Sequence, residues 1–261
     1  NEIWRIIGVM NNIDDGTGKK ETRIKLIRNE SIGEYSWDIS ESSENHSYGV
    51  NEWSQADLMK LLNPGYESES VGGSLYYNGK SGYCYNLSIY DLASCNFTSS
   101  GLKGTLKALI DDVVWNTGTN GTNSWKSASN GLASHFYSYE RSSNNGKICT
   151  SGNSCNDTVE RTTTWKGKIG LMYPSDYGYA TSGGSTSTRT SCLNKELYNW
   201  ASASDCKNND WLYNSSNKQW TISPAADSSY AIVAFDVYTA GNVQGDDVHY
   251  AGVVRPSVYL I

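Results

Sequence analysis

Histidines and acidic pairs are the side chains of this sequence that could act on a substrate or hold a metal ion. The histidines are His46, His135 and His249, and they lie far apart in the chain. None belongs to the H-E-x-x-H spacing that binds zinc, so we expect structural or surface histidines. The acidic pairs are Asp14-Asp15, Asp111-Asp112 and Asp246-Asp247. None fits an EF-hand pattern, so we expect solvated loop carboxylates, and only the last pair is a candidate for holding an ion.

One glycine-rich segment imitates a nucleotide-binding loop. Gly73–Ser81 reads G-S-L-Y-Y-N-G-K-S, which places one residue more between its glycines than a phosphate-binding loop has. Its two tyrosines would also fill the space that a phosphate needs. By the same logic, Gly16-Thr17-Gly18-Lys19 is a hairpin turn. The sequence therefore predicts no cofactor, no catalytic residue and no enzymatic activity.

The cysteines point to a compartment rather than to a reaction. No C-x-x-C occurs, which disfavours zinc ribbons and thioredoxin-like redox sites. The sequence allows many pairings, of which the simplest is three local disulfides: Cys84–Cys95, Cys149–Cys155 and Cys192–Cys206. Disulfides indicate an oxidising compartment or a cell surface. The alternative is a set of free thiols in a cytosolic protein.

Charge and hydropathy exclude two classes of partner. The 261-residue chain has a net charge of −6 and a pI of about 5.1. Its longest basic run is Lys19-Lys20, whereas nucleic-acid-binding proteins gather many basic residues on one face. No apolar run approaches the length of a membrane helix. Because Glu2–Ile7 is typical of a strand, we expect a mature or trimmed ectodomain whose missing upstream part would carry any membrane anchor.

The elements of the first half are predicted from periodicity and turn residues. Ile3–Met10 and Arg23–Arg28 flank a turn-rich segment and predict a hairpin, and the near-alternation in Arg23–Arg28 predicts one solvent-facing side. A short helix is expected with Ser54 as N-cap and Asp57 at the third position. Its buried stripe would be Leu58, Met59, Leu61 and Leu62. Apolar residues at helical spacing predict a second helix over residues 101–115.

Strands dominate the expected second half. Trp165–Tyr173 predicts a strand, followed by a helical turn from Pro174. Shorter strands are expected at 211–213, 219–222, 232–237 and 253–261, and the last of them should pair with Arg23–Arg28. Two helices in the first half and many short, mostly antiparallel strands indicate one α+β domain over residues 1–261. Long polar loops, stapled by disulfides, would connect them.

The segment from Ala225 to Ile261 carries the sharpest functional signal. Between 233 and 238, apolar residues alternate with unrelated side chains, which predicts one core face and one displayed face. Val243, Val248 and Val254 look like fixed anchors, with Asn, Asp, Tyr, Ser, Gly and His between them. Such residues are typical of binding surfaces, because Tyr offers rigid contact area and the small polar residues offer adaptable hydrogen bonds. An ordinary polar loop between core strands is the alternative.

Four blocks of the chain resemble a known family. They are Asn51–Tyr66 (N-E-W-S-Q-A-D-L-M-K-L-L-N-P-G-Y), Trp165–Tyr179 (W-K-G-K-I-G-L-M-Y-P-S-D-Y-G-Y), Trp211–Pro224 (W-L-Y-N…Q-W-T-I-S-P) and Val254–Leu260 (V-R-P-S-V-Y-L). They are similar to the signature blocks of a bacterial and phage C-type-lectin-fold family, and the resemblance spans nearly the whole chain. Many relatives are surface proteins with a prepilin-like anchor, and some are variable proteins of diversity-generating retroelements. In the variable proteins, adenine-directed mutagenesis rewrites a C-terminal ligand-binding face.

The resemblance implies a C-type-lectin-like fold, with residues 211–261 as the candidate variable segment. The implied ligand-binding positions are Asp227, Ser229, Tyr230, Ala234, Asp236, Tyr238, Asn242, Gln244, Asp246, Asp247, His249 and Tyr250. The implied scaffold positions are Val233, Phe235, Val237, Val243, Val248 and Arg255-Pro256. Where the family has Gly-Val-Arg-Pro, this chain carries an extra valine in Gly252–Pro256. The calcium-dependent sugar motifs of animal C-type lectins are absent, and no active cysteine pair of the formylglycine-forming branch can be placed.

These patterns lead to one expected function and two alternatives. We expect a non-enzymatic ligand-binding domain outside the cell, on a cell surface or on a phage particle. Its partner would be a protein or glycan bound through residues 227–252, with Tyr230, Tyr238 and Tyr250 contributing most. The first alternative is a structural, pilin-like head that assembles with copies of itself. The remote alternative is an enzyme of the formylglycine-generating type.

Overall fold

The computed structural model describes residues 2–39, 49–86, 91–118, 124–127, 130–141, 162–184, 188–225 and 232–261. Within these ranges the chain mixes short helices with mostly antiparallel strands, which confirms the predicted α+β class at that level. Every helix in them is too short or too polar to span a bilayer.

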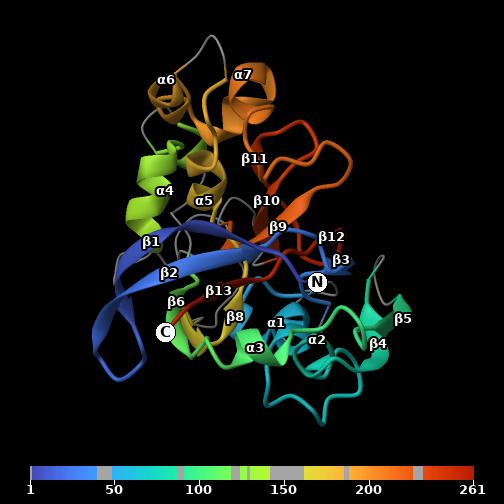
Figure 1. The fold of residues 1–261 in the computed structure, drawn as a ribbon. Helices are drawn as coiled ribbons and strands as arrows, with labels where there is room; N and C mark the ends of the chain where they lie inside the picture. The colour runs from blue at the N-terminus through green and yellow to red at the C-terminus, as the bar shows by residue number, and fades with distance from the viewer. Residues whose placement is uncertain are drawn as a thin grey trace.

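Sheet A joins the two ends of the chain. Its strands, in spatial order, are β1 (Trp4–Asp14), β2 (Lys20–Arg28), β13 (Ser257–Tyr259) and β8 (Ile169–Gly170). β13 pairs antiparallel with β2, with Ser257 opposite Ile27 and Tyr259 opposite Lys25. The predicted pairing of the N-terminal hairpin with the C-terminal segment is therefore confirmed (Figure 1).

The predicted N-terminal hairpin forms, and its turn uses one of the acidic pairs. Asp14 Oδ1 accepts hydrogen bonds from the backbone of Gly16 and Gly18, at 2.7 and 3.3 Å. Both glycines have a left-handed φ, 82° and 90°, which residues with a Cβ adopt only at a cost. Asp14 thus shapes the turn.

β2 has a more exposed and a buried side, and two charged residues are on the buried side. Arg23 and Lys25 are buried, whereas Ile24 between them is exposed. The cause is tertiary, because the Lys25 ammonium meets the Asp176 carboxylate inside the protein. Alternation correctly indicates a strand with two unlike faces, but long-range charge pairing decides which face turns inward.

Sheet B carries the C-terminal half of the expected binding segment. Its order is β11 (Val243–Asp247), β10 (Val233–Val237), β9 (Gln219–Pro224), β12 (Ala251–Val253) and β3 (Glu34–Ser36). All neighbouring strands are antiparallel except β9 and β12. The strands predicted at 219–222 and 232–237 are therefore present. Trp211 and Leu212 lie in a turn and Tyr213 has no regular structure, so the strand predicted at 211–213 is wrong.

The strand predicted over 253–261 is divided between the two sheets. β12 ends at Val253 in sheet B and β13 begins at Ser257 in sheet A. Arg255 fixes the crossing, because its guanidinium donates hydrogen bonds to the carbonyl oxygens of Arg28 (3.1 Å) and Asn29 (2.5 Å). The Arg-Pro block thus locks the point where the chain changes sheet.

The remaining strands form two separate antiparallel pairs, and the helices are short. β4 (Ser81–Tyr85) pairs with β5 (Leu92–Asn96), and β6 (Val113–Asn116) pairs with β7 (Thr164–Gly167). The helices are η1 (Trp53–Gln55), α1 (Asp57–Leu62), α2 (Leu75–Asn78), α3 (Gly104–Lys107), η2 (Ser124–Lys126), α4 (Ala133–Glu140), α5 (Pro174–Tyr179), α6 (Arg189–Leu193), η3 (Leu197–Ser202) and α7 (Ser204–Lys207).

Of the two helices predicted in the first half, the first is present in part and the second is absent. The buried stripe of the first is confirmed in α1, although Ser54 lies in the preceding 3₁₀ turn and the α-helix begins at Asp57. The second is wrong: residues 101–115 contain the single-turn helix α3, an isolated bridge between Ile110 and Leu260, and the start of β6. Strand pairing with distant residues overrides the helical spacing there. The helical turn expected from Pro174 is present as α5.

Two of the three predicted disulfides lie in the described part of the chain, and both are present. Cys84 bonds to Cys95 across β4 and β5, and Cys192 bonds to Cys206 between α6 and α7. Cys149 and Cys155 lie outside the described residues. The two bonds support the expectation of an oxidising compartment.

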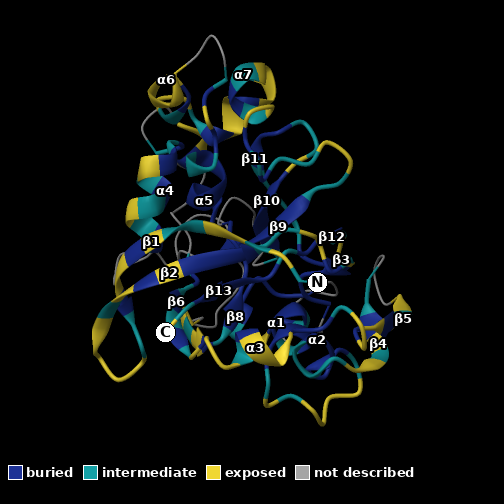
Figure 2. Ribbon diagram, viewed as in Figure 1, coloured by how far each residue is buried: buried dark blue, intermediate teal, exposed yellow. Residues whose placement is uncertain are grey.

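Two hydrophobic clusters fill the interior, and β2 contributes to both. Leu26 belongs to the cluster around Trp37, Trp53 and Trp220, whereas its neighbour Ile27 belongs to the other. The second cluster includes Phe235, Trp125 and Trp200. Figure 2 shows buried residues along β9, β10 and α5, and exposed residues on β1 and the β1–β2 turn.

Candidate functional site

The predicted scaffold of the C-terminal segment is buried. Val233, Phe235 and Val237 on β10 are buried, as are Val243 and Val248 on and after β11. Phe235 meets the rings of Trp125 and Phe136 edge to face, with ring centroids 5.1 and 5.3 Å apart. These contacts hold the β10–β11 hairpin against the hydrophobic cluster that contains Trp125 and Phe136.

The predicted display of Ala234 and Asp236 is wrong. Both residues are fully buried at 0% exposure, so all of β10 is covered on its two faces. β10 is an inner strand of sheet B, between β9 and β11, and its second face is packed as well as its first. Asn242 and His249 are also buried. A ligand at the surface would not reach these four side chains in this conformation.

The other described positions are exposed or partly exposed, and they lie on or beside β11. Tyr238 precedes the β10–β11 turn and is 39% exposed, and Tyr250 follows β11 and is 43% exposed. Gln244, Asp246 and Asp247 on β11 are partly exposed. We call these five residues the C-terminal face. The predicted positions Asp227, Ser229 and Tyr230 lie outside the described residues.

Lys218 and the buried Trp220 lie beside the C-terminal face, and neither was among the predicted positions. The Lys218 ammonium lies 2.6 Å from the Asp246 carboxylate. It also lies over the rings of Trp220 and Tyr250, at 4.5 and 5.2 Å from their centroids. A basic residue at the start of an aromatic strand is the sequence signal that could have indicated them. Lys218 therefore holds Asp246 and Tyr250 in fixed relative positions.

A buried carboxyl lies directly under this surface. Neither oxygen of Asp236 has a hydrogen-bond partner among the described residues. Burial raises the pKa of the Asp236 carboxyl well above its ordinary value, and the Lys218 ammonium opposes that shift. Burial also lowers the pKa of His249, whose ring packs at a tilt against Tyr250 with 4.1 Å between centroids. The described residues hold no group of three or more side chains able to bind a metal ion.

A larger cavity lies elsewhere, between the β1–β2 hairpin, β6 and α4. Its volume is about 530 Å³, and Tyr137, Glu140, Arg141, Tyr173 and Tyr259 are among its lining residues. The Arg141 guanidinium pairs with Glu140 at 3.1 Å and stacks on Tyr137 at 3.7 Å. Burial raises the pKa of Glu140 to about 7. The Glu140 and Arg141 charges that face this cavity are thus paired with each other.

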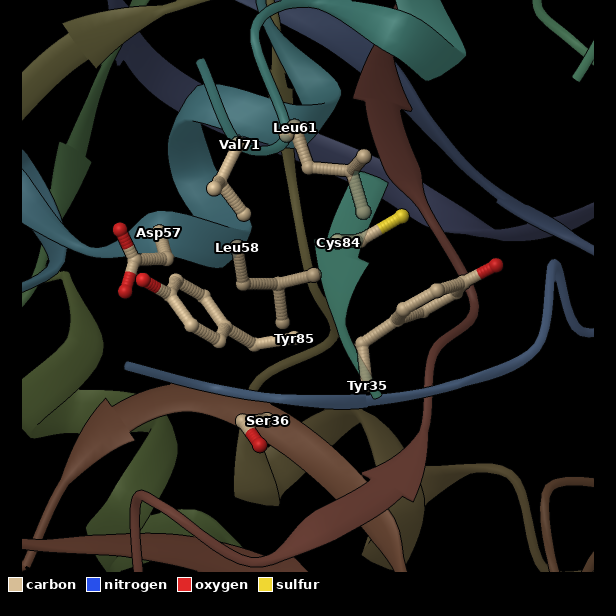
Figure 3. A pocket seen from close by; sticks show the side chains of 9 residues that line it. Tyr35, Ser36, Asp57, Leu58, Leu61, Val71, Cys84 and Tyr85 are labelled. Carbon is tan, nitrogen blue, oxygen red and sulfur yellow. The ribbon is translucent and has the colours of Figure 1, made fainter. Parts of the chain in front are cut away.

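A second pocket, beside the Cys84–Cys95 bond, is too small for a ligand. Figure 3 shows Tyr35, Leu58, Cys84 and Tyr85 around it, with the Tyr85 hydroxyl near Asp57. Its volume of about 10 Å³ is the space of a single water molecule. It is part of the packing around α1.

The other residues singled out for chemistry have structural surroundings. His135 lies in α4 with its ring against Tyr139, and Asp111 pairs with Lys168 at 3.2 Å. In the glycine-rich segment, Leu75 and Tyr76 are buried in α2. His46 lies outside the described residues.

The chain matches no protein-family model, no curated protein and no solved structure. The functional conclusion therefore depends on the geometry above.

Proposed function

We propose that this chain is a non-enzymatic, extracellular ligand-binding domain that binds a protein or glycan through the C-terminal face. One observation carries the proposal. Exposed Tyr238 and Tyr250 frame the partly exposed polar residues of β11, while the apolar residues of the same hairpin are buried. This separates a fixed scaffold from a replaceable surface.

The arrangement favours binding because little has to be ordered when a ligand docks. The hairpin is held by the buried ring contacts of Phe235, and Lys218 holds Tyr250 and Asp246 before any partner arrives. Preorganised side chains lose less conformational entropy on binding. Tyrosines supply rigid contact area and are frequent hot spots of interfaces.

The C-type-lectin-like fold and the retroelement-variable family remain part of this proposal. Support comes from sheet A, in which the N-terminal hairpin and the C-terminal strand pair, and from the hairpin β10–β11 that presents the face. The two described disulfides support an extracellular location. In this proposal, variation replaces the side chains of the C-terminal face and leaves the buried scaffold unchanged.

A matched pair of variants tests the binding face. Labelled protein would be applied to a glycan array and to intact bacterial cells, and bound label would be measured. Tyr238→Ala with Tyr250→Ala should weaken binding about tenfold or more, because two interface tyrosines together are worth over 1.4 kcal/mol. Tyr83→Ala, which removes an exposed tyrosine on β4, should leave binding unchanged. Equal binding by the double variant and the wild type would refute the proposed face.

A self-assembling structural subunit is the second candidate, and β1 favours it. β1 is the edge strand of sheet A, and its Ile6 and Val9 are 65% and 63% exposed. Exposed apolar edge strands are templates for pairing with another chain. Sedimentation velocity should show concentration-dependent association that Ile6→Lys with Val9→Lys abolishes. A wild-type chain that stays monomeric at high concentration would remove this candidate.

A further inference from the structure

A lysine and an aspartate are buried together where sheet A packs on α5. Lys25 on β2 is 0% exposed and Asp176 on α5 is 2% exposed. The Lys25 Nζ atom lies 2.5 Å from Asp176 Oδ2. Aromatic rings enclose the amine: Nζ is 4.2 Å from the ring centroid of Tyr173, 5.4 Å from Trp115 and 5.6 Å from Tyr259. The two groups are thus held in contact and away from water.

Burying an ion pair at this position costs free energy. Removing both charges from water costs more than their attraction returns in many buried pairs, and apolar residues often serve as well. Burial also lowers the pKa of Lys25, which favours the neutral amine. A neutral, desolvated lysine is a nucleophile.

A second carboxyl group lies close to the pair. Glu140 ends α4, and its carboxylate accepts hydrogen bonds from the backbone N–H of Ser175, at 3.0 Å, and from the Ser175 hydroxyl. Ser175 directly precedes Asp176, and burial, together with the charge of Asp176, raises the pKa of Glu140 to about 7. A group with that pKa takes up and releases protons readily near neutral pH.

The Asp176 carboxyl is also polarised by the backbone. The N–H of Tyr173 donates a hydrogen bond to Asp176 Oδ2 at 2.8 Å, on the same oxygen that Lys25 contacts. Charge that develops on Oδ2 during attack at the carboxyl carbon would be stabilised by this preformed donor. The amine and the polarised carboxyl are therefore in contact among aromatic rings, and the proton carrier Glu140 is bonded to Ser175, the residue next to Asp176.

We propose that Lys25 and Asp176 join in an intramolecular amide bond that forms without another protein. Glu140 first moves one proton from Lys25 Nζ to Asp176 Oδ1, which gives an amine and a carboxylic acid protonated on the oxygen that will leave. Lys25 Nζ attacks Asp176 Cγ and the N–C bond forms. Glu140 accepts a proton from the nitrogen and delivers it to Oδ1, the C–Oδ1 bond breaks, and one water leaves. No oxidant, reductant or co-reactant is consumed.

The cross-link would tie distant parts of the fold. It connects β2 to the start of α5 across 151 residues of sequence, and β2 is the strand that also pairs with C-terminal β13. The cavity beside Glu140, Tyr173 and Tyr259 gives the released water a way out. The bond would keep the N-terminal hairpin attached even when the surrounding packing is lost.

Mass spectrometry of the purified full chain tests the proposal. After reduction and alkylation of every cysteine, the intact mass should be lower by one water than the mass calculated for the alkylated sequence. Trypsin should release Ile24–Arg28 joined to Ile169–Arg189, with the link at Lys25 and Asp176. A chain with the full sequence mass would overturn the proposal, as would a water loss mapped to an Asp15-Gly16 succinimide. Because the wild-type chain decides this, the result does not depend on whether a variant folds.

Variants assign the roles within the step. Lys25→Met and Asp176→Ala should each restore the full sequence mass. Glu140→Gln should keep the pair but leave most of the chain unreacted at times when the wild type is complete. Lys218→Met, which removes another ion-paired lysine, should show the same missing water as the wild type. Wild-type reaction kinetics in Glu140→Gln would overturn the role of Glu140.

Discussion

The buried Asp236 carboxyl should make the protein less stable as pH rises, and Asp236→Asn should remove that effect. The folded protein holds the proton of Asp236 more tightly than the unfolded chain does, since burial raises its pKa from 3.8. Raising the pH therefore removes the proton from the unfolded chain first and favours unfolding. One proton difference changes the free energy of unfolding by about 1.4 kcal/mol per pH unit. The loss begins above pH 3.8 and ends once the folded carboxyl has also ionised.

Urea denaturation followed by tryptophan fluorescence measures this dependence. Wild type and Asp236→Asn would be compared at several values between about pH 4 and pH 8, and their difference isolates Asp236 from other buried acids such as Asp210. The variant should match the wild type near the acid end and become the more stable protein as pH rises. A difference that stays constant with pH, or a variant that is less stable at the alkaline end, would refute the reasoning.

Three further outcomes follow from the same contacts. Lys218→Met removes the positive charge that opposes the raised pKa of Asp236, so the pH-dependent loss of stability should extend to higher pH than in the wild type, measured by the same denaturation series. Phe235→Ala should lower the free energy of unfolding by about 3–5 kcal/mol, because it leaves a cavity beside Trp125 and Phe136. The control Tyr83→Ala should change the free energy of unfolding little, and chemical denaturation measures both variants. Replacing Cys192 and Cys206 by serine frees a loop with a sequence separation of 14 and should cost about 3 kcal/mol, read from the shift in the denaturation midpoint.

Local patterns in the sequence predicted the parts of the fold that local physics determines. The N-terminal hairpin, the buried stripe of α1 and the turn at Pro174 follow from turn residues, apolar spacing and proline geometry. The false helix over residues 101–115 shows the limit. Its apolar spacing fits a helix, but the bridge from Ile110 to Leu260 and the pairing of β6 with β7 depend on residues far away in sequence.

In the candidate site, too, local sequence patterns predict some features and long-range contacts determine the rest. Alternation in β10 indicated a strand, but the predicted displayed face is wrong, because the sequence could not show that a neighbouring layer covers Ala234 and Asp236 as well. Lys25 and Asp176 could not be paired from the sequence, because 151 residues separate them. Lys218 had a weak local signal beside Trp220, and its contact with Asp246 required the strands to be placed first.

Sequencing the gene segment for residues 227–252 across a natural population tests the proposed diversified binding face most directly. We expect adenine-templated substitutions at the codons of the C-terminal face, Tyr238, Gln244, Asp246, Asp247 and Tyr250, and a near-copy repeat beside the gene. Buried Phe235, Val243 and Val248 should not change, and Ala234 and Asp236 should be constant with them. An invariant segment without a repeat, or substitutions as frequent at the buried positions as at the exposed ones, would contradict the account.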